Sequence, residues 1–238
     1  MASEYYKWLA RNEKPEVPRE LTRKEKRANW WYYNKWYVAL GLLLLVCLVS
    51  MVKSALSQTT PDYQFAYVGT TALPDDTVSA LKGSLAALGE DLNGDGSVTV
   101  QLVQYTFSGE ADPSVAASSE VRLMADIMEC ESYFFLLEDP EQFQKSYHSL
   151  CRIDGTLPDE EEPSAEGTYL KWEQCPVLAG LDLGQYSYDV MGKAVAGDSG
   201  ELMSQLSIAR RGFWTEKTAP YPEGCGALWE KMTEGAVS

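Results

Sequence analysis

The chain has 238 residues and a net charge of −15, with 35 acidic residues against 20 basic ones. A protein that binds nucleic acid neutralises phosphates with a basic patch, so this charge balance argues against that class. The five cysteines include no CxxC pair, so the sequence indicates neither a zinc ribbon nor a thioredoxin-type site.

Residues 36–56 form the most apolar stretch of the chain and predict a membrane-spanning helix. No charged residue occurs from Val38 to Val52. A bilayer core of about 30 Å needs roughly 20 helical residues, so Lys53 and the flanking aromatic residues must complete the span. Aromatic side chains favour the headgroup level, and six of them crowd the N-terminal side: Trp30, Trp31, Tyr32, Tyr33, Trp36 and Tyr37. This pattern favours an uncleaved signal anchor.

Cleavage of this segment as a signal peptide is the main alternative. Ala55-Leu56-Ser57 offers a passable small-x-small cleavage site. Signal peptides begin with a short n-region, however, and the segment before this apolar run is long, charged and aromatic. Lipoprotein attachment at Cys47 is disfavoured, because bulky Val46 stands where a lipobox needs a small residue.

Charge predicts the orientation of the anchor. Residues 1–52 contain nine basic and five acidic residues, a net charge of +4, so residues 53–238 must carry −19 for the chain to total −15. Short segments rich in Lys and Arg stay in the cytoplasm. The expected segments are therefore a cytoplasmic basic and aromatic segment 1–35, a plasma-membrane helix 36–56, a polar stalk 57–62 and one extracytoplasmic domain 63–238.

The first part of that domain alternates predicted strands and helices. Residues 63–68 and 98–107 are rich in aromatic and β-branched residues and predict strands. A helix is predicted between them, after Pro74-Asp75, by apolar residues at helical spacing: Val78, Leu81, Leu85, Leu88 and Leu92. A second helix begins at Ser118 or Ser119, with three apolar residues on one face: Val121, Met124 and Met128.

A continuous apolar run at residues 133–137 predicts the next strand. Such runs are typical of strands that are buried on both faces, which is the habit of parallel sheets. Asp139-Pro140-Glu141 then opens a third helix with a capping acid and a proline in the first turn. The β-α-β-α-β-α order predicts an α/β fold with a mainly parallel sheet and right-handed crossovers.

Beyond this point the pattern weakens. Residues 157–167 form an acidic, proline-containing loop. Residues 169–172 and 206–210 predict strands, and residues 226–233 predict a closing helix. Residues 173–200 are rich in Gly and Asp and show little periodicity, so no element is predicted there.

Residues 91–99, DLNGDGSVT, match the first nine positions of an EF-hand or dockerin-type calcium loop. Asp91, Asn93 and Asp95 would supply oxygen ligands. Such loops close with an acid at position twelve, but here Leu102 occupies it. The alternative is a helix-to-strand turn that uses Asn and Gly for left-handed backbone and Asp for capping. The loop is therefore a weak structural calcium site or such a turn, and we expect no other cofactor.

Four cysteines lie in the predicted extracytoplasmic domain: Cys130, Cys151, Cys175 and Cys225. An exported domain can oxidise them, and four cysteines allow three pairings. Two disulfides, Cys130–Cys151 and Cys175–Cys225, would tie together elements close in sequence and staple the less regular C-terminal half. Four free thiols are the other possibility, and the spacing does not decide between them.

Arg210-Arg211 is the one basic spot of this acidic domain, directly after a predicted strand. Sheets of this kind bind ligands at the carboxyl ends of their strands, and Arg recognises carboxylate or phosphate with two hydrogen bonds. We therefore expect Arg210 and Arg211 to bind a ligand beside a cleft. The alternative is that they neutralise nearby acids.

Catalytic motifs are missing from the sequence. It contains no GxSxG, HExxH, Walker A or dinucleotide-binding glycine motif. His148 is the single histidine, so a nucleophile–histidine pair could be built only around it. We therefore expect a protein that is not an enzyme.

Four segments, WWYYNKWYVALG, YVGTTALPDDTVSAL, DLNGDGSVTVQ and SYFFLLEDPEQF, resemble uncharacterised single-pass membrane proteins of Gram-positive anaerobes. The β-α-β-α-β start, whose apolar strand ends in Glu138-Asp139-Pro140, is similar to a lobe of type II extracytoplasmic solute-binding proteins. The resemblance implies a membrane-anchored extracytoplasmic binding or accessory domain with an unknown small-molecule ligand. The alternative is a structural or assembly protein of the cell envelope that binds a protein or polymer.

Overall fold

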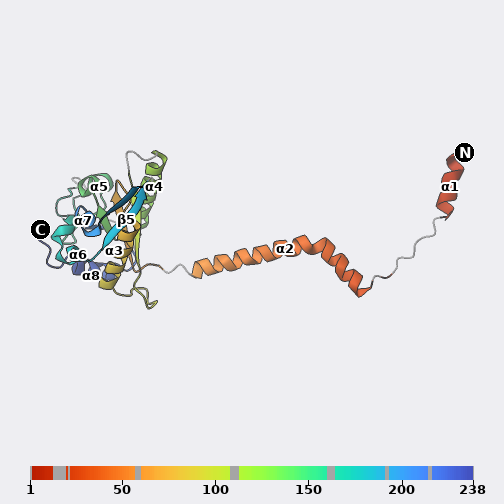
Figure 1. The fold of residues 1–238 in the computed structure, drawn as a ribbon, viewed down its shortest axis with the longest axis horizontal. Coiled ribbons are helices and arrows are strands. Elements are labelled where there is room, and N and C mark those ends of the chain that lie inside the picture. The colour runs from red at the N-terminus through yellow and green to blue at the C-terminus, as the bar shows by residue number, and fades with distance from the viewer. Residues whose placement is uncertain are drawn as a thin grey trace. The chain divides into compact units, whose positions relative to one another are not determined.

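The computed structural model divides the chain into two compact units, residues 1–59 and residues 60–238 (Figure 1). The residues that it describes are 2–12, 20, 22–56, 60–107, 113–159, 164–190, 193–213 and 216–237.

The first unit contains helix α1, Ala2–Asn12, and the long helix α2, Arg23–Leu56. Helix α2 has 34 residues and begins well before the predicted span 36–56. A capping box explains its start, because the Thr22 backbone N–H donates to Glu25 Oε2 at 2.8 Å and the Glu25 N–H donates to Thr22 Oγ1 at 3.4 Å. The most apolar 18-residue stretch within residues 23–51 has a mean hydropathy of 1.7 and is not buried by other described parts of the protein. The helix is long and apolar enough to serve as a membrane anchor or as a signal sequence.

The second unit is built on a five-stranded sheet in the order β2-β1-β3-β7-β4. Its strands are β1 (Tyr63–Gly69), β2 (Val100–Thr106), β3 (Phe134–Leu137), β4 (Tyr169–Lys171) and β7 (Ser207–Arg210). Strand β1 is parallel to both β2 and β3, whereas β7 is antiparallel to both β3 and β4. The sheet is therefore mixed, and the prediction of a mainly parallel sheet is wrong for its second half.

Three helices connect or follow the parallel strands in the predicted order. Helix α3, Asp75–Leu88, joins β1 to β2, helix α4, Pro113–Glu129, joins β2 to β3, and helix α5, Pro140–Tyr147, follows β3. The predicted cap of α5 is confirmed, since the Asp139 side chain accepts a hydrogen bond from the Gln142 backbone N–H at 2.9 Å. Helix α5 ends at Tyr147, and the capping residue His148 has a left-handed φ of 47°.

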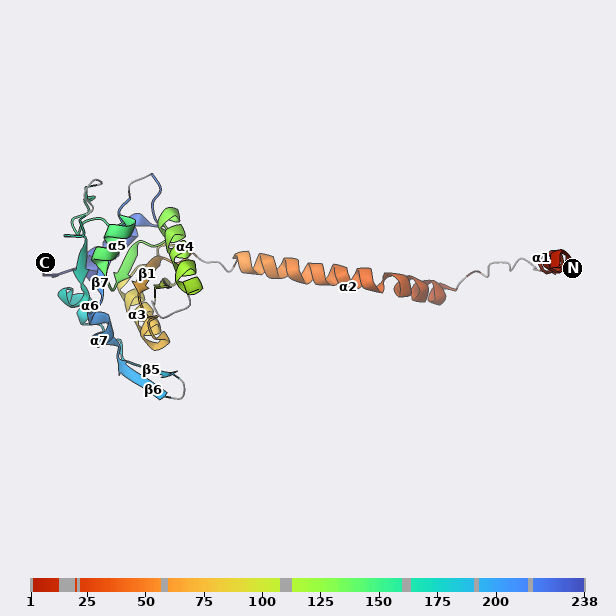
Figure 2. The ribbon, with the colours of Figure 1, turned by 90° about the horizontal axis from the view of Figure 1, so that it is seen from above.

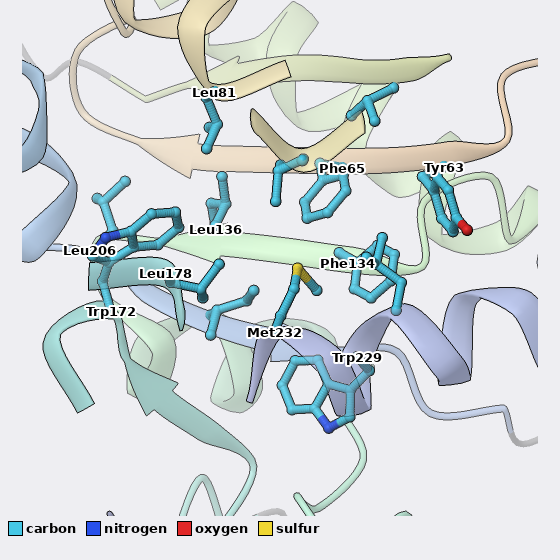
Figure 3. Packing of buried hydrophobic residues seen from close by; sticks show 14 of the residues in the cluster. Tyr63, Phe65, Leu81, Phe134, Leu136, Trp172, Leu178, Leu206, Trp229 and Met232 are labelled. Carbon is cyan, nitrogen blue, oxygen red and sulfur yellow. The ribbon is translucent and has the colours of Figure 1, made fainter. Parts of the chain in front are cut away.

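Apolar side chains pack on both faces of the sheet. On one face, α3 and the C-terminal helix α8, Pro222–Met232, contribute to a large core whose labelled members in Figure 3 are Tyr63, Phe65, Leu81, Phe134, Leu136, Trp172, Leu178, Leu206, Trp229 and Met232. On the other face, α4 and α5 cover a smaller core of Ala66, Tyr105, Leu123, Phe135, Leu137, Phe143, Leu150 and Ala209. All four residues of β3 are buried for this reason, as the apolar run predicted.

Helix α4 has an apolar face that does not contribute to either core. Val121, Met124 and Met128 share a face as predicted, but their exposed fractions are 69%, 49% and 73%. Leu123, in contrast, is fully buried against the sheet.

The C-terminal part is more structured than its sequence pattern predicted. The predicted strands are confirmed as β4 and β7, and the closing helix α8 begins earlier, at Pro222, a residue that favours the first turn of a helix. The stretch without predicted elements contains two short helices, η1 (Trp172–Gln174) and α6 (Pro176–Ala179). They are followed by a hairpin of β5 (Gln185–Val190) and β6 (Lys193–Asp198), and then by helix α7 (Ser199–Ser204). Figure 2 shows the β5–β6 hairpin extending away from the sheet.

Candidate ligand-binding site

The strand order creates a topological switch point between β1 and β3. The chain leaves β1 for β2 on one side and returns through α4 to β3 on the other side. In open α/β sheets, ligands bind beyond the carboxyl ends of the strands at such a point. Here the residues that follow the two strands are Thr70 and Glu138.

The Glu138 carboxylate is held in place by residues of β1 and the turn that follows it. Its Oε1 atom lies 2.6 Å from the Tyr67 hydroxyl, and its Oε2 atom accepts hydrogen bonds from the Thr70 backbone N–H and from Thr70 Oγ1, both at 2.8 Å. The Tyr67 hydroxyl also lies 2.7 Å from the Thr71 carbonyl oxygen. Burial and the neighbouring Glu138 carboxylate raise the pKa of Tyr67 well above its usual range. Glu138 itself remains exposed at the sheet edge.

Gly69 leaves the space in which Tyr67 and Glu138 meet. A Cβ atom at position 69 would lie 2.2 Å from Tyr67 Oη and 2.5 Å from Glu138 Oε1. Any side chain at this position would therefore separate the hydroxyl from the carboxylate.

Glu138 lines three cavities at this edge. The first, of about 350 Å³, lies against α5 and is lined by Thr70, Phe107, Gln142, Phe143, Ser146 and Tyr147. The second, of about 340 Å³, lies beside the hairpin and is lined by Tyr67, Leu73, Tyr186, Tyr188, Gln205 and Leu206. The third, of about 300 Å³, is lined by Asp139, Glu141, Tyr169, Lys171, Glu173 and Ser204. The Glu138 carboxylate thus lines three cavities, each large enough for a small molecule.

The β5–β6 hairpin supplies two aromatic rings to the second cavity. The rings of Tyr186 and Tyr188 stack with centroids 5.9 Å apart. The Ser187 backbone N–H donates to Asp76 Oδ2 at 3.2 Å, which links the hairpin to the start of α3. Gly197 on β6 permits the Tyr186 ring to lie close to the backbone, because a Cβ there would be 2.4 Å from Tyr186 Oη.

Arg210 and Arg211 do not form the predicted pair at the ligand edge. Because β7 is antiparallel to β3, Arg210 lies opposite Phe134 at the start of β3, whereas Glu138 follows the end of that strand. The Arg210 guanidinium lies 5.3 Å from the centre of the Trp229 ring and donates to the Ile153 carbonyl at 2.7 Å. Antiparallel pairing thus places them at the edge of the sheet opposite to Glu138, and their binding of a ligand stays a prediction.

Arg211 is turned to the opposite face of the sheet from Arg210. It is buried, and its NH2 group donates to the Ile127 carbonyl oxygen on α4. Burial lowers the pKa of Arg211, partly offset by the neighbouring Cys130 and Asp126. The two guanidinium groups therefore cannot hold one ligand together.

The Asp91 loop is closed by its own hydrogen bonds. The Asp91 carboxylate accepts from the backbone N–H groups of Gly94 at 2.7 Å and Gly96 at 2.8 Å. Asn93 Oδ1 and Asp95 Oδ1 accept from the N–H groups two residues further on. Gly94 and Gly96 have φ values of 76° and 90°, so the loop has the left-handed glycines of the turn interpretation. The calcium site stays a prediction.

All five cysteines are free thiols in this structure, and the four in the second unit are buried. Burial raises the pKa of Cys175 to about 11 and that of Cys225 to about 12. His148 is exposed at the end of α5, with Nε2 3.0 Å from the Lys145 carbonyl oxygen, which is a helix-end contact. Within the described ranges, no group of three or more His, Cys, Asp or Glu residues could hold a metal ion.

Comparison of the chain with protein-family models, with curated proteins and with solved structures found no match. The site is therefore defined by its own geometry. Sequence reasoning named neither Glu138 nor Tyr67 as a site residue, although the rule about carboxyl ends, applied to residues 63–68 and 133–137, would have pointed to the residues that follow them.

Proposed function

We propose that this chain is a membrane-anchored extracytoplasmic binding or accessory protein without catalytic activity. The observation that supports the proposal is the Glu138 carboxylate, fixed by three hydrogen-bond contacts and shared by three cavities at the switch point of the sheet. Cavities at this edge are the usual ligand sites of α/β folds. The apolar helix α2 would tether the binding domain to the membrane.

The proposed orientation places the basic N-terminus in the cytoplasm and the acidic domain outside. A reporter enzyme that folds only outside the cytoplasm, fused after Ser238, should be active. The same reporter inserted after Asn12, ahead of the intact helix α2, should be inactive. If only the N-terminal fusion were active, the orientation would be the opposite of the proposed one.

Thermal melting of the full chain in detergent micelles tests the binding function. The panel contains amino acids, sugars, organic amines and anions, and separate samples contain calcium or a chelator. A ligand at a hundred times its Kd adds about 2.7 kcal/mol to the free energy of unfolding, which is several degrees in a domain of this size. We expect one compound class to raise the melting temperature of the chain but not that of a Glu138→Gln variant.

Calcium gives a separate outcome of the same panel. A rise in melting temperature with millimolar calcium that is lost in an Asp91→Asn variant would establish a weak site in the Asp91 loop. A cooperative transition that no compound moves would contradict the small-molecule function.

A structural or assembly role in the cell envelope is the second candidate. The exposed apolar face of α4, formed by Val121, Met124 and Met128, favours it, because exposed apolar side chains that share one face can form an interaction surface. Photo-crosslinking from position 124 in whole cells, against position 120 as a control on the same helix, tests this role. A single specific adduct from position 124 would support it, and its absence would count against it.

A further inference from the structure

We propose that the second cavity at Glu138 binds an ammonium group carried on a small apolar body. The inference rests on the proposed binding function and names the chemical class of the ligand. The cavity is the one lined by Tyr67, Tyr186, Tyr188 and Glu138, and it is called the tyrosine cavity below.

The charge of the tyrosine cavity favours a cation. Glu138 is the one charged side chain among the described residues that line it. Asp76, which accepts a hydrogen bond from Ser187 of the hairpin, is also acidic. An anionic ligand would meet uncompensated negative charge there, whereas a cation would neutralise the Glu138 carboxylate.

The carboxylate is fixed before any ligand arrives. Its two oxygens are positioned by the Tyr67 hydroxyl and by two donors of Thr70. A ligand that pairs with it does not have to order a flexible side chain, which lowers the entropic cost of binding. Glu138 remains exposed, so it can still accept a hydrogen bond or an ion pair from the cavity side.

The aromatic lining favours an ammonium group over a metal ion. Tyr186 and Tyr188 present two stacked rings to the cavity, and a cation within about 6 Å of an aromatic face is attracted by its quadrupole. A divalent metal ion would need six or more oxygen ligands or several His and Cys side chains. The other lining residues include polar Thr71 and Gln205, and also Leu73, Leu202 and Leu206, which suit the apolar body of an organic amine.

The size of the tyrosine cavity limits the ligand. Its volume of about 340 Å³ is at the lower end of the range of small-molecule sites. Both a free amine and the side chain of a lysine in a peptide carry the required group. The experiment must therefore distinguish these two sources.

Calorimetric titration of the full chain in detergent micelles tests the proposal with matched ligands. Choline is compared with 3,3-dimethylbutan-1-ol, which has the same shape without the charge. An acetylated and amidated Gly-Lys-Gly peptide is compared with the same peptide acetylated at Lys Nζ. We expect the charged member of at least one pair to bind at least about tenfold more tightly than its neutral partner. Choline binding identifies a free amine, and binding of the peptide alone identifies a lysine side chain.

Variants connect that binding to the tyrosine cavity. Glu138→Gln keeps the shape of the side chain and should weaken binding at least about tenfold. Tyr188→Leu removes an exposed ring with little risk to folding and should weaken binding roughly three- to tenfold. Glu173→Gln, which removes a carboxylate from the third cavity only, should leave the affinity unchanged.

Failure of this inference is distinguishable from failure of the proposed function. If amines do not bind but another compound class raises the melting temperature in a way that depends on Glu138, the ammonium assignment is overturned and the binding function stands. If amines bind equally well to wild type and to both cavity variants, the site is elsewhere and the inference is overturned. If no compound of any class binds, both proposals fail.

Discussion

At the scale of single residues, the site depends on a contact between Tyr67 and Glu138 that a glycine makes possible. We expect Gly69→Ala to destabilise the second unit by about 1–3 kcal/mol, because the added methyl group overlaps both the hydroxyl and the carboxylate. The melting temperature should fall by roughly 2–4 °C per kcal/mol.

Gly83 is a matched control for that substitution. It lies in helix α3, and no atom apart from its chain neighbours and the surrounding helix backbone comes within 4 Å of the place that an alanine Cβ would take. Gly83→Ala should therefore stabilise by about 0.5–1 kcal/mol through helix propensity. Equal effects of the two substitutions would contradict the proposed crowding at Gly69.

The buried thiols predict a loss of stability at alkaline pH. The folded pKa values of Cys175 and Cys225, about 11 and about 12, lie above the ordinary value of 9.0. Above pH 9 the unfolded chain therefore releases protons that the folded chain keeps, so the stability present below pH 9 is lost as pH rises. Between pH 8 and pH 10 each thiol should reduce the free energy of unfolding by about 1 kcal/mol.

Urea unfolding of the full chain under reducing conditions checks this pH dependence. Cys175→Ala and Cys225→Ala should each flatten the profile between pH 8 and pH 10, even though both lower the stability at pH 8. Buried tyrosines such as Tyr67 and Tyr105, whose pKa values are raised above the ordinary value of about 10, also reduce the stability as pH approaches 10, so the thiol contribution is the difference between wild type and variant. A profile that is unchanged in both variants would show that groups other than the thiols cause the loss.

Residue chemistry alone does not identify Glu138. Arg210 and Arg211 attract attention because they are basic residues in an acidic domain, but their strand direction places them away from the switch point. Glu138 is one acid among 35 acidic residues of the chain. Only its position directly after a buried parallel strand distinguishes Glu138 from the others. To recognise that position as a ligand site, one must know the order of the strands in the sheet.

At the scale of elements, helix α4 has two apolar faces with opposite roles. We expect Leu123→Ala to destabilise the domain by about 2–5 kcal/mol, because Leu123 is fully buried in the smaller core. Met124→Ala, one residue further along the helix, should change the stability by less than about 0.5 kcal/mol, since about half of the residue is already exposed. Urea unfolding of the two variants measures both effects. A large loss of stability in Met124→Ala would show that the Met124 face of the helix, and not the Leu123 face alone, packs in the core.

Local signals in the sequence sufficed for the β-α-β-α-β-α order but not for the rest of the sheet. The Asp139-Pro140 start of α5 and the spacing of Leu81 and Leu85 are local patterns, and the structure confirms the elements they predicted. The direction of β7 depends on pairing with distant β3, which no periodicity encodes. The β5–β6 hairpin is largely exposed, so it lacks the apolar alternation by which strands are found.

At the scale of the whole molecule, the α/β domain is independent of the long helix for its core. Every residue of the two core clusters lies between Tyr63 and Ala236. We therefore expect residues 60–238, produced without residues 1–59, to be soluble and to unfold cooperatively within a few degrees of the full chain in detergent. Circular dichroism melts of both proteins check this, and an unfolded fragment would show that the domain requires the first unit.

The continuity of helix α2 fixes how its two ends are rotated relative to each other about the helix axis. It continues as one helix from Arg23 to Leu56, so the basic and aromatic end and the apolar end share one hydrogen-bonded backbone. With 3.6 residues per turn, a single residue inserted beside Lys35 would rotate one end against the other by about 100°. The angular phase between the aromatic side chains and the apolar segment is thus set by the number of residues, not only by their composition.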